Sequence, residues 1–173
     1  MGGTESLISL VDHAVAAGDP GKIVDGLRTG LCALINTGEC VLPDRVLDCC
    51  ADHYARRLIH RDDVRGYSIV AMTWGPKQGT PVHDHAGLWC VEGVFKGSIE
   101  VQQFELLERQ GARFRFEPRG SFHAGIGSAG CLIPPHEYHS IRNAGAKPAV
   151  SVHIYGGEMD HCSVMNRDRK SVV

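Results

Sequence analysis

The sequence lacks the features that mark several large classes of protein. Its 173 residues carry a net charge of only −2, and the basic residues are scattered apart from a short stretch, NRDRK, so no nucleic-acid-binding surface is indicated. No apolar run approaches the roughly 20 residues that a membrane-spanning helix needs. The first residues, MGGTESLISLVDH, have no basic segment before the apolar run, which argues against a secretory leader. We therefore expect a cytoplasmic protein that binds neither nucleic acid nor membrane.

The seven cysteines form no recognisable disulfide or zinc pattern. Their number is odd, none forms a C-x-x-C pair, and two of them are adjacent at positions 49 and 50. A disulfide framework and a structural zinc knuckle are therefore not expected. No G-x-G-x-x-G follows an expected strand either, so the sequence offers no dinucleotide-binding site.

The periodicity of the chain changes from helical to alternating near residue 67. Before that point, apolar residues recur at helical spacing in three stretches, 6–19, 21–38 and 42–60. After it, short alternating runs such as YSIVAMTW and AVSVHIYGG are separated by glycine, proline or polar turns. Many short strands predict a mainly β fold, either a sandwich or a small barrel. We expect one domain over 1–173, with residues 1–66 mostly helical and packed against a β-barrel at 67–165.

A pair of histidines on an expected strand indicates a metal site. His83 and His85 are two residues apart, and residues i and i+2 of a strand point to the same side of the sheet. The stretch PPHEYHSIRN offers His136 and His139 as further ligands, because strands distant in sequence can bring their inward side chains together. An H-x-H pair alone is common, so the residues around it decide the interpretation.

The spacing after this pair resembles the first motif of the cupins, a family of small jelly-roll-like β-barrels. In that motif H-x-H is followed by an acid and, after six more residues, by a glycine. His83, His85 and Gly97 fit, whereas Cys90 stands in the acid's position and Lys77 replaces an earlier glycine. Most mononuclear iron sites of this kind use two histidines and a carboxylate. Three neutral imidazoles would instead leave iron(II) with its full charge, which favours anionic ligands such as a thiolate.

The second cupin motif, P-x-G-x-x-H-x-x-x-N, matches the residues from Pro134 to Asn143. His136 stands where glycine is usual, and His139 stands at the ligand position. The resemblance therefore implies that His139, rather than His136, is the third ligand.

Over residues 54–162 the chain is similar to thiol dioxygenases, specifically the cysteine dioxygenases. HDHAGLWCVEGVFKG resembles their H-D-H with a cysteine five residues beyond the second histidine, and AVSVHIYGG resembles their S-x-H-x-Y. The resemblance implies a thioether between Cys90 and Tyr155 and a hydrogen-bonded relay of Ser151, His153 and Tyr155. The relay residues alternate along an expected strand, so all of them face one side of the sheet.

The stretch YARRLI resembles the Y-x-R of the cysteine dioxygenases. The resemblance implies that Arg56, with Tyr54 nearby, binds the substrate carboxylate, and a guanidinium fork suits that group. A shift of one residue would give this role to Arg57. WGPKQGTPVHDH and Trp89 look closer to the related enzymes that oxidise 3-mercaptopropionate.

The resemblance implies a non-haem iron(II) thiol dioxygenase that adds both atoms of O₂ to a small thiol bearing a carboxylate. Its cofactor would be Fe²⁺, its partners a small thiol and O₂, and its preferred reaction the conversion of L-cysteine to cysteine sulfinic acid. The first alternative is a dioxygenase of 3-mercaptopropionate or another mercapto acid. The others are a cupin that binds a metal or ligand without turnover and a zinc or manganese isomerase, which usually retains the carboxylate. The sequence leaves the oligomeric state open.

Overall fold

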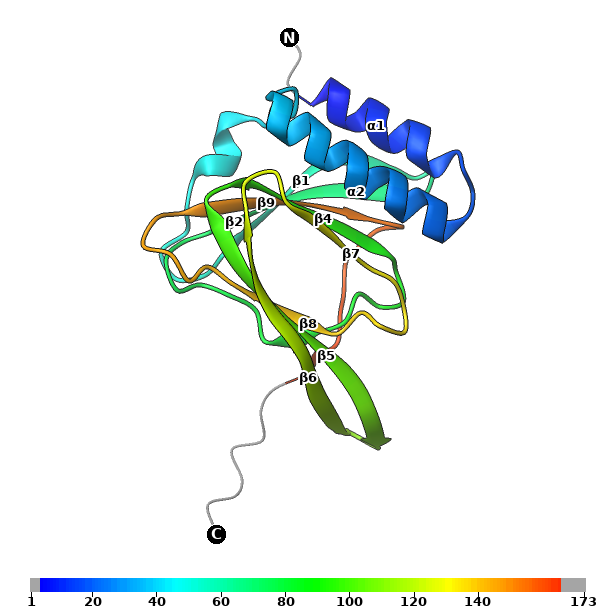
Figure 1. Cartoon of the computed structure of the whole chain (residues 1–173), viewed down its shortest axis with the longest axis vertical. Coiled ribbons are helices and arrows are strands. Elements are labelled where there is room, and N and C mark those ends of the chain that lie inside the picture. The colour runs from blue at the N-terminus through cyan, green and yellow to red at the C-terminus, as the bar shows by residue number, and fades with distance from the viewer. Residues whose placement is uncertain (1–3, 166–173) are drawn as a thin grey trace.

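The computed structural model describes residues 4–165, which form a mainly β molecule with helices on one side (Figure 1). The helical elements of this part are α1 (Glu5–Val15), α2 (Pro20–Thr37) and a 3-10 helix (Asp44–Leu47). Its strands are β1 (Ala55–Asp62), β2 (Tyr67–Trp74), β3 (Val82–His83), β4 (Cys90–Lys96), β5 (Ser98–Gln110), β6 (Arg113–Gly125), β7 (Ala129–Leu132), β8 (His139–Arg142), β9 (Ala149–Tyr155) and β10 (Val164–Met165).

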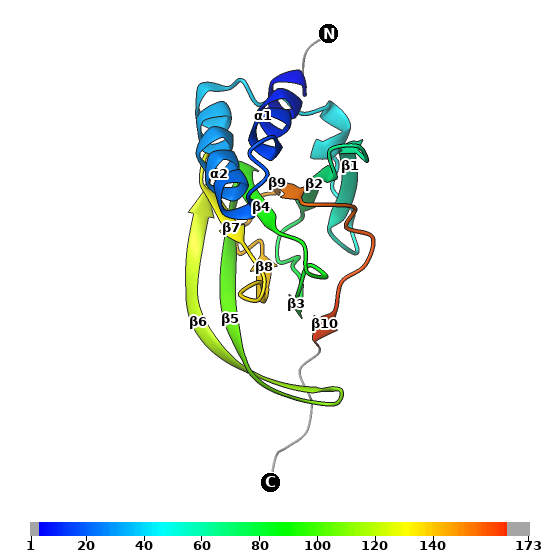
Figure 2. The same ribbon diagram turned by 90° about the vertical axis from the view of Figure 1, so that its right-hand side faces the viewer.

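The strands form two five-stranded sheets, ordered β1-β2-β9-β4-β7 and β10-β3-β8-β5-β6, with antiparallel pairing throughout. The predicted mainly β, jelly-roll-like fold is confirmed, although the sheets face each other without closing into a barrel (Figures 1 and 2). Side chains of both sheets pack together between them, among them Trp74, Val101 and Ile141. The candidate site lies beside these packed side chains, between the two sheets.

The two helices cover the outer face of the first sheet. Asp19 caps α2 by accepting a hydrogen bond from the Lys22 backbone N–H at 3.0 Å, and the helix ends at Gly38 with a φ of 77°. Buried residues of both helices pack on the outward side chains of β2, β4 and β9. β2 is therefore buried along its whole length, because the helices cover one face and the second sheet covers the other.

The expected third helix over 42–60 is wrong. Only Asp44–Leu47 is helical there, and β1 begins at Ala55. β1 is the edge strand of its sheet and pairs with β2 alone, in a register that places Ala55 opposite Thr73. This long-range pairing overrides a helical pattern that rested on few apolar residues. Strands thus begin inside the segment 1–66 that we expected to be mostly helical.

No helix of residues 4–165 has the length and apolar character needed to cross a membrane.

Candidate metal centre and adjoining cavity

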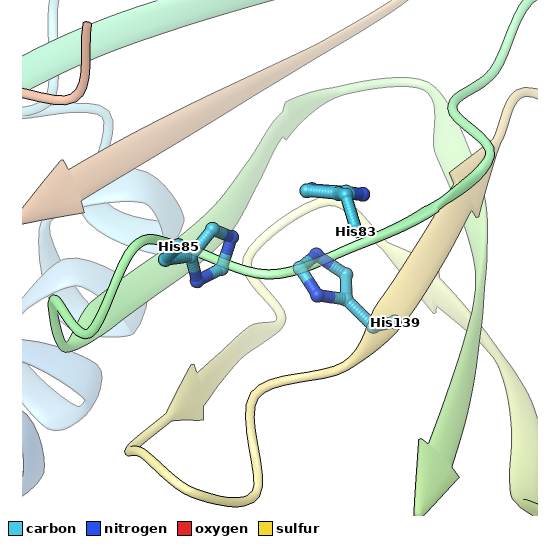
Figure 3. Close-up of side chains that lie close together, drawn as sticks. All are labelled: His83, His85 and His139. Carbon is cyan, nitrogen blue, oxygen red and sulfur yellow. The ribbon is translucent and has the colours of Figure 1, made fainter. Parts of the chain in front are cut away.

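Three histidines, two on neighbouring strands and one in the loop after the first of them, meet between the sheets. His83 ends β3 and lies opposite His139 at the start of β8, and His85 follows in the loop after β3 (Figure 3). The ring centroids are 4.4 Å apart for His83 and His139, 5.4 Å for His83 and His85, and 4.9 Å for His85 and His139. One ring nitrogen from each lies within 4.8 Å of the others, so the three could hold one metal ion. His136 is exposed and lies outside this group.

The hydrogen bonds around these rings fit a metal ligand set. Nδ1 of His83 lies 3.1 Å from the Pro81 carbonyl oxygen, and Nδ1 of His139 lies 3.0 Å from the Glu137 carbonyl oxygen. A carbonyl oxygen only accepts, so each Nδ1 carries a hydrogen, and in the neutral ring each Nε2 then presents a lone pair. Nε2 of His139 and both ring nitrogens of His85 are buried without a hydrogen-bond partner. A bound cation would satisfy these buried atoms, which are otherwise unfavourable.

The electrostatics favour neutral rings at His83 and His85. Burial, followed by the neighbouring charge of His139, lowers the pKa of His83 to about 4 and that of His85 to about 3. Imidazoles must be deprotonated to bind a metal, so these two rings are ready to do so near neutral pH.

A buried carboxylate, which the sequence analysis did not select, lies beside the histidines. Glu92 of β4 is 7% exposed, and its Oε1 is 3.0 Å from Nε2 of His139 and 3.4 Å from Nδ1 of His153. Burial alone raises the pKa of Glu92, but His139 and His153 outweigh it and hold the pKa well below its usual range. Burial likewise lowers the pKa of His139, yet Glu92 outweighs burial and the net direction is upward. In the sequence, the mark of Glu92 as a site residue is its spacing of two residues from Cys90, which places both side chains on the same face of β4.

The three residues expected to form a relay lie on the inner face of β9. Ser151 Oγ is 2.7 Å from Nε2 of His153, and Nε1 of Trp74 donates to the same hydroxyl at 2.9 Å. Nδ1 of His153 points toward Glu92, and the rings of His153 and Tyr155 stack with centroids 6.1 Å apart. Within residues 4–165 no hydrogen bond joins His153 to Tyr155. The structure therefore brings Ser151 and His153 into direct contact and directs the imidazole toward Glu92.

Cys90 and Tyr155 face each other across neighbouring strands. They are directly opposite in the antiparallel pair of β4 and β9, and both are buried. The Cβ atoms of such a pair are typically about 4.5–5.5 Å apart, so the two side chains can meet. Burial raises the pKa of the Cys90 thiol and of the Tyr155 phenol well above their usual ranges, so both groups remain protonated.

A cavity of about 200 Å³ opens beside the histidines. Its volume lies below the roughly 300–1,000 Å³ of drug-sized sites, which suits a small ligand. The segment 159–162 forms part of its wall. Its other lining residues include Tyr54, Arg56, Trp74, His83, His153 and Tyr155.

The two adjacent arginines of β1 point in opposite directions, as neighbours on a strand do. Arg56 lines the cavity, and its Nη2 donates to the Met159 carbonyl oxygen at 2.6 Å. Arg57 turns away and donates to the Asp48 carbonyl oxygen at 2.6 Å and to Thr73 Oγ1 at 3.2 Å. Only Arg56 is therefore placed to contact a molecule in the cavity.

Comparisons with known proteins identify the family to which this chain belongs. The model of the family "Cysteine dioxygenase type I" matches residues 46–168. Cysteine dioxygenase type 1 of Danio rerio is 22% identical over 115 residues, which cover 66% of this chain and 56% of the relative. This chain therefore spans about half the length of the curated relatives that it matches.

Solved structures support the fold. A protein of Thermus thermophilus has a TM-score of 0.51 at 18% identity, covering 66% of this chain and 94% of that one. A protein of Klebsiella pneumoniae with a double-stranded β-helix domain has a TM-score of 0.51 at 16% identity, covering 72% and 94%. Because the family model spans well over half of its residues, this chain belongs to the cysteine dioxygenase type I family.

Proposed function

We propose that this chain is a thiol dioxygenase that converts a small carboxylate-bearing thiol, preferably L-cysteine, to its sulfinate. The observation that carries the proposal is the convergence of His83, His85 and His139 beside a small cavity that Arg56 lines. Iron(II) held by the three histidines would supply the redox chemistry that brings O₂ to sulfur. The reaction is R–SH + O₂ → R–SO₂⁻ + H⁺. Sulfur supplies all the electrons that reduce O₂, so no further reductant is required.

Arg56 would bind the substrate carboxylate. A guanidinium carries five N–H donors, and the contact with Met159 uses one of its nitrogens. The remaining donors can form charge-assisted hydrogen bonds with a carboxylate, which positions the substrate's sulfur toward the histidines. Asp160 also lines the cavity, and its exposed carboxylate lies 2.5 Å from Nδ1 of His161. A guanidinium and a carboxylate in one small cavity suit an amino acid that carries both charges, which favours cysteine over 3-mercaptopropionate.

Tyr155 would provide a protonated phenol in the cavity. Because burial raises its pKa well above the usual range, this side chain can donate a hydrogen bond to a reacting group throughout the physiological pH range. A thioether with Cys90, which lies opposite it, would restrict rotation of the phenol ring. His153 and Ser151 would act as positioning residues, because Trp74 and Glu92 hold their two ends.

Product analysis tests this proposal. The purified chain, loaded with iron(II), should consume O₂ and form cysteine sulfinate in equal molar amounts. Cysteamine, which lacks the carboxylate, should react poorly, and 3-mercaptopropionate should react less well than cysteine. A chain that binds iron and thiol but consumes no O₂ would instead be a binding cupin. A higher kcat/KM for 3-mercaptopropionate than for cysteine would transfer the preference to mercapto acids.

A further inference from the structure

A second cavity, of about 250 Å³, lies between the two sheets at the edge that β6 and β7 form; we call it the β6–β7 cavity. The cavity that Arg56 lines, the Arg56 cavity, is at the other edge, beside β1 and β10 (Figure 2). Within residues 4–165 the two cavities share no lining residue. His83 and His139 lie on β3 and β8, between the two edges. The candidate metal centre therefore has one cavity on each side.

A glycine accounts for the empty space of the β6–β7 cavity. Gly130 of β7 is directly opposite Glu92 of β4, so a side chain at this position would face the space between the sheets, as Glu92 does. A Cβ added at Gly130 would meet no heavy atom of the described chain within 4 Å, its two neighbours in sequence apart. The missing side chain thus leaves the inner face of the first sheet open beside Glu92.

The inner end of the β6–β7 cavity lies against a histidine of the metal centre. Glu92 lines the cavity, and its Oε1 is 3.0 Å from Nε2 of His139. Gln103 also lines it and is opposite His139 in the pairing of β5 and β8. Most of the remaining wall is apolar and includes Val94, Ile99, Val101, Ala124 and Leu132. The cavity is therefore an apolar space that reaches the residues flanking His139.

The two substrates of the proposed reaction need different surroundings. A carboxylate-bearing thiol is charged and suits the Arg56 cavity, whereas O₂ is small, uncharged and apolar. Apolar cavities stay dry and take up apolar guests such as xenon. A thiol held between Arg56 and the histidines also occupies the way in from its own cavity. O₂ that arrives after the thiol would therefore reach the histidines more directly from the other edge.

We propose that the β6–β7 cavity binds O₂ and delivers it to the metal centre. The inference rests on the proposed function for the use of O₂ as a substrate. Phe122 and His123 line the cavity and are exposed, so it is open to solvent, whereas Glu92 at its inner end is buried. The Glu92 carboxylate faces His139 and His153, so it does not set an unpaired charge in the path of an apolar molecule.

Xenon binding by the full chain without metal tests the cavity and needs no turnover. Xenon is an apolar atom that occupies dry apolar cavities, and it stands in for O₂. Methyl NMR spectra of the wild type under increasing xenon pressure should show saturable shifts at Ile99, Val101 and Leu132, which line the cavity. The methyl groups of Leu7 and Leu27 should keep their positions, because these residues belong to the core on the other face of the first sheet.

Gly130→Leu fills the cavity from β7. The new side chain enters open space, and the φ of Gly130 lies outside the left-handed region, so the backbone is not strained. We expect this variant to lose the xenon shifts. Loaded with iron(II), it should have a kcat/KM for O₂ about 10-fold lower than the wild type, the low end of the range over which association rates vary among variants of one binding surface. Its kcat/KM for cysteine at saturating O₂ should be unchanged.

Gly125→Leu is the matched control. Gly125 of β6 also has open space at its Cβ, but it is not part of the lining of the β6–β7 cavity. This variant should keep both the xenon shifts and the wild-type kcat/KM for O₂. If Gly130→Leu fails to fold by circular dichroism, Ala124→Leu, which enters the same cavity from β6, takes its place.

The outcomes separate this inference from the proposed function. A wild type without xenon shifts in this cavity, or a folded Gly130→Leu variant with the wild-type kcat/KM for O₂, overturns the O₂ route and leaves the proposed function intact. An equal fall in kcat/KM for O₂ and for cysteine also overturns the route, because the substitution would then disturb the centre as a whole. A wild-type chain that consumes no O₂ with any thiol overturns the proposed function and the delivery of O₂ with it.

Discussion

Replacing Arg56 with glutamine removes the positive charge from the wall of the cavity and keeps much of the side chain's length. In the structure the Arg56 guanidinium makes one hydrogen bond, to the Met159 carbonyl oxygen, and takes part in no ion pair within residues 4–165. Its charge is therefore not already neutralised by a carboxylate of this part of the chain. We expect the substitution to weaken the binding of thiols that carry a carboxylate.

The size of the effect follows from the type of bond that is lost. Hydrogen bonds to charged groups typically contribute about 1.5–3 kcal/mol, or roughly 10- to 150-fold in binding. Arg56 is exposed, and solvent screening weakens its charge interactions, so an increase in KM for cysteine of roughly 10-fold is expected. The value of kcat should fall less than KM rises, because the arginine contacts the carboxylate equally before and during the reaction.

The neighbouring arginine provides the control. Arg57→Gln removes the same charge from the same strand, but Arg57 holds Asp48 and Thr73 rather than the cavity. Its loss should lower the thermal unfolding temperature and leave KM for cysteine unchanged. Initial rates of O₂ uptake at varied cysteine concentrations, together with thermal melts, measure both effects.

Two results would contradict this reasoning. If Arg56→Gln kept the KM of the wild type while Arg57→Gln raised it, the anchor would be the other arginine. If wild-type protein oxidised cysteamine as fast as cysteine, no carboxylate anchor would be in use at all.

Three further predictions concern the centre itself. His139→Ala should lose both bound iron and O₂ uptake, and full iron retention by metal analysis would remove this residue from the ligand set. After turnover, intact-mass spectrometry should show a species lighter by a pair of hydrogens that is absent in Cys90→Ser; an unchanged mass would mean that Cys90 and Tyr155 are not joined. Burial lowers the pKa of His83 to about 4 and of His85 to about 3, so the unfolded chain takes up these protons first, near pH 6.5. The free energy of unfolding of metal-free protein should therefore fall as the pH drops from about 6.5 toward 4, and a flat profile from denaturant titrations would contradict this.

The parts of the fold that the sequence predicts well are those with a local pattern. The helix over Pro20–Thr37 begins directly after the cap Asp19, starts with a proline and is followed by Gly38, and its apolar face repeats at the helical period. Strand β2, which begins at Tyr67, is equally clear from its composition. β1 has no such local mark, because an edge strand buries few side chains and its identity depends on pairing with β2.

In the candidate site, too, some residues are marked by a local sequence pattern and others depend on how the strands pair. The spacing of His83, His85 and His139 could be compared with known motifs, and the structure brings these residues together. Arg56 and Arg57 differ in the direction in which each side chain points from β1. The pairing of β1 with β2 sets that direction, and the sequence alone does not show it. The motif spacing points to the position of Cys90 and not to Glu92, the next residue on the same face of β4.

The arrangement of the strands suggests why a metal would matter for the order of the site as well as for its chemistry. His83 lies on a strand of two residues that pairs with β8 only through His139, whereas Cys90 and Tyr155 lie on long and fully paired strands. On its other side β3 pairs with the two residues of β10, so the half of the site that holds the ligands rests on short strand pairings. A ligand that binds only the folded state stabilises it, and the gain grows with concentration relative to its dissociation constant. A metal that joins His83, His85 and His139 would therefore fix the short strand against its neighbour, and site order and metal binding would be coupled.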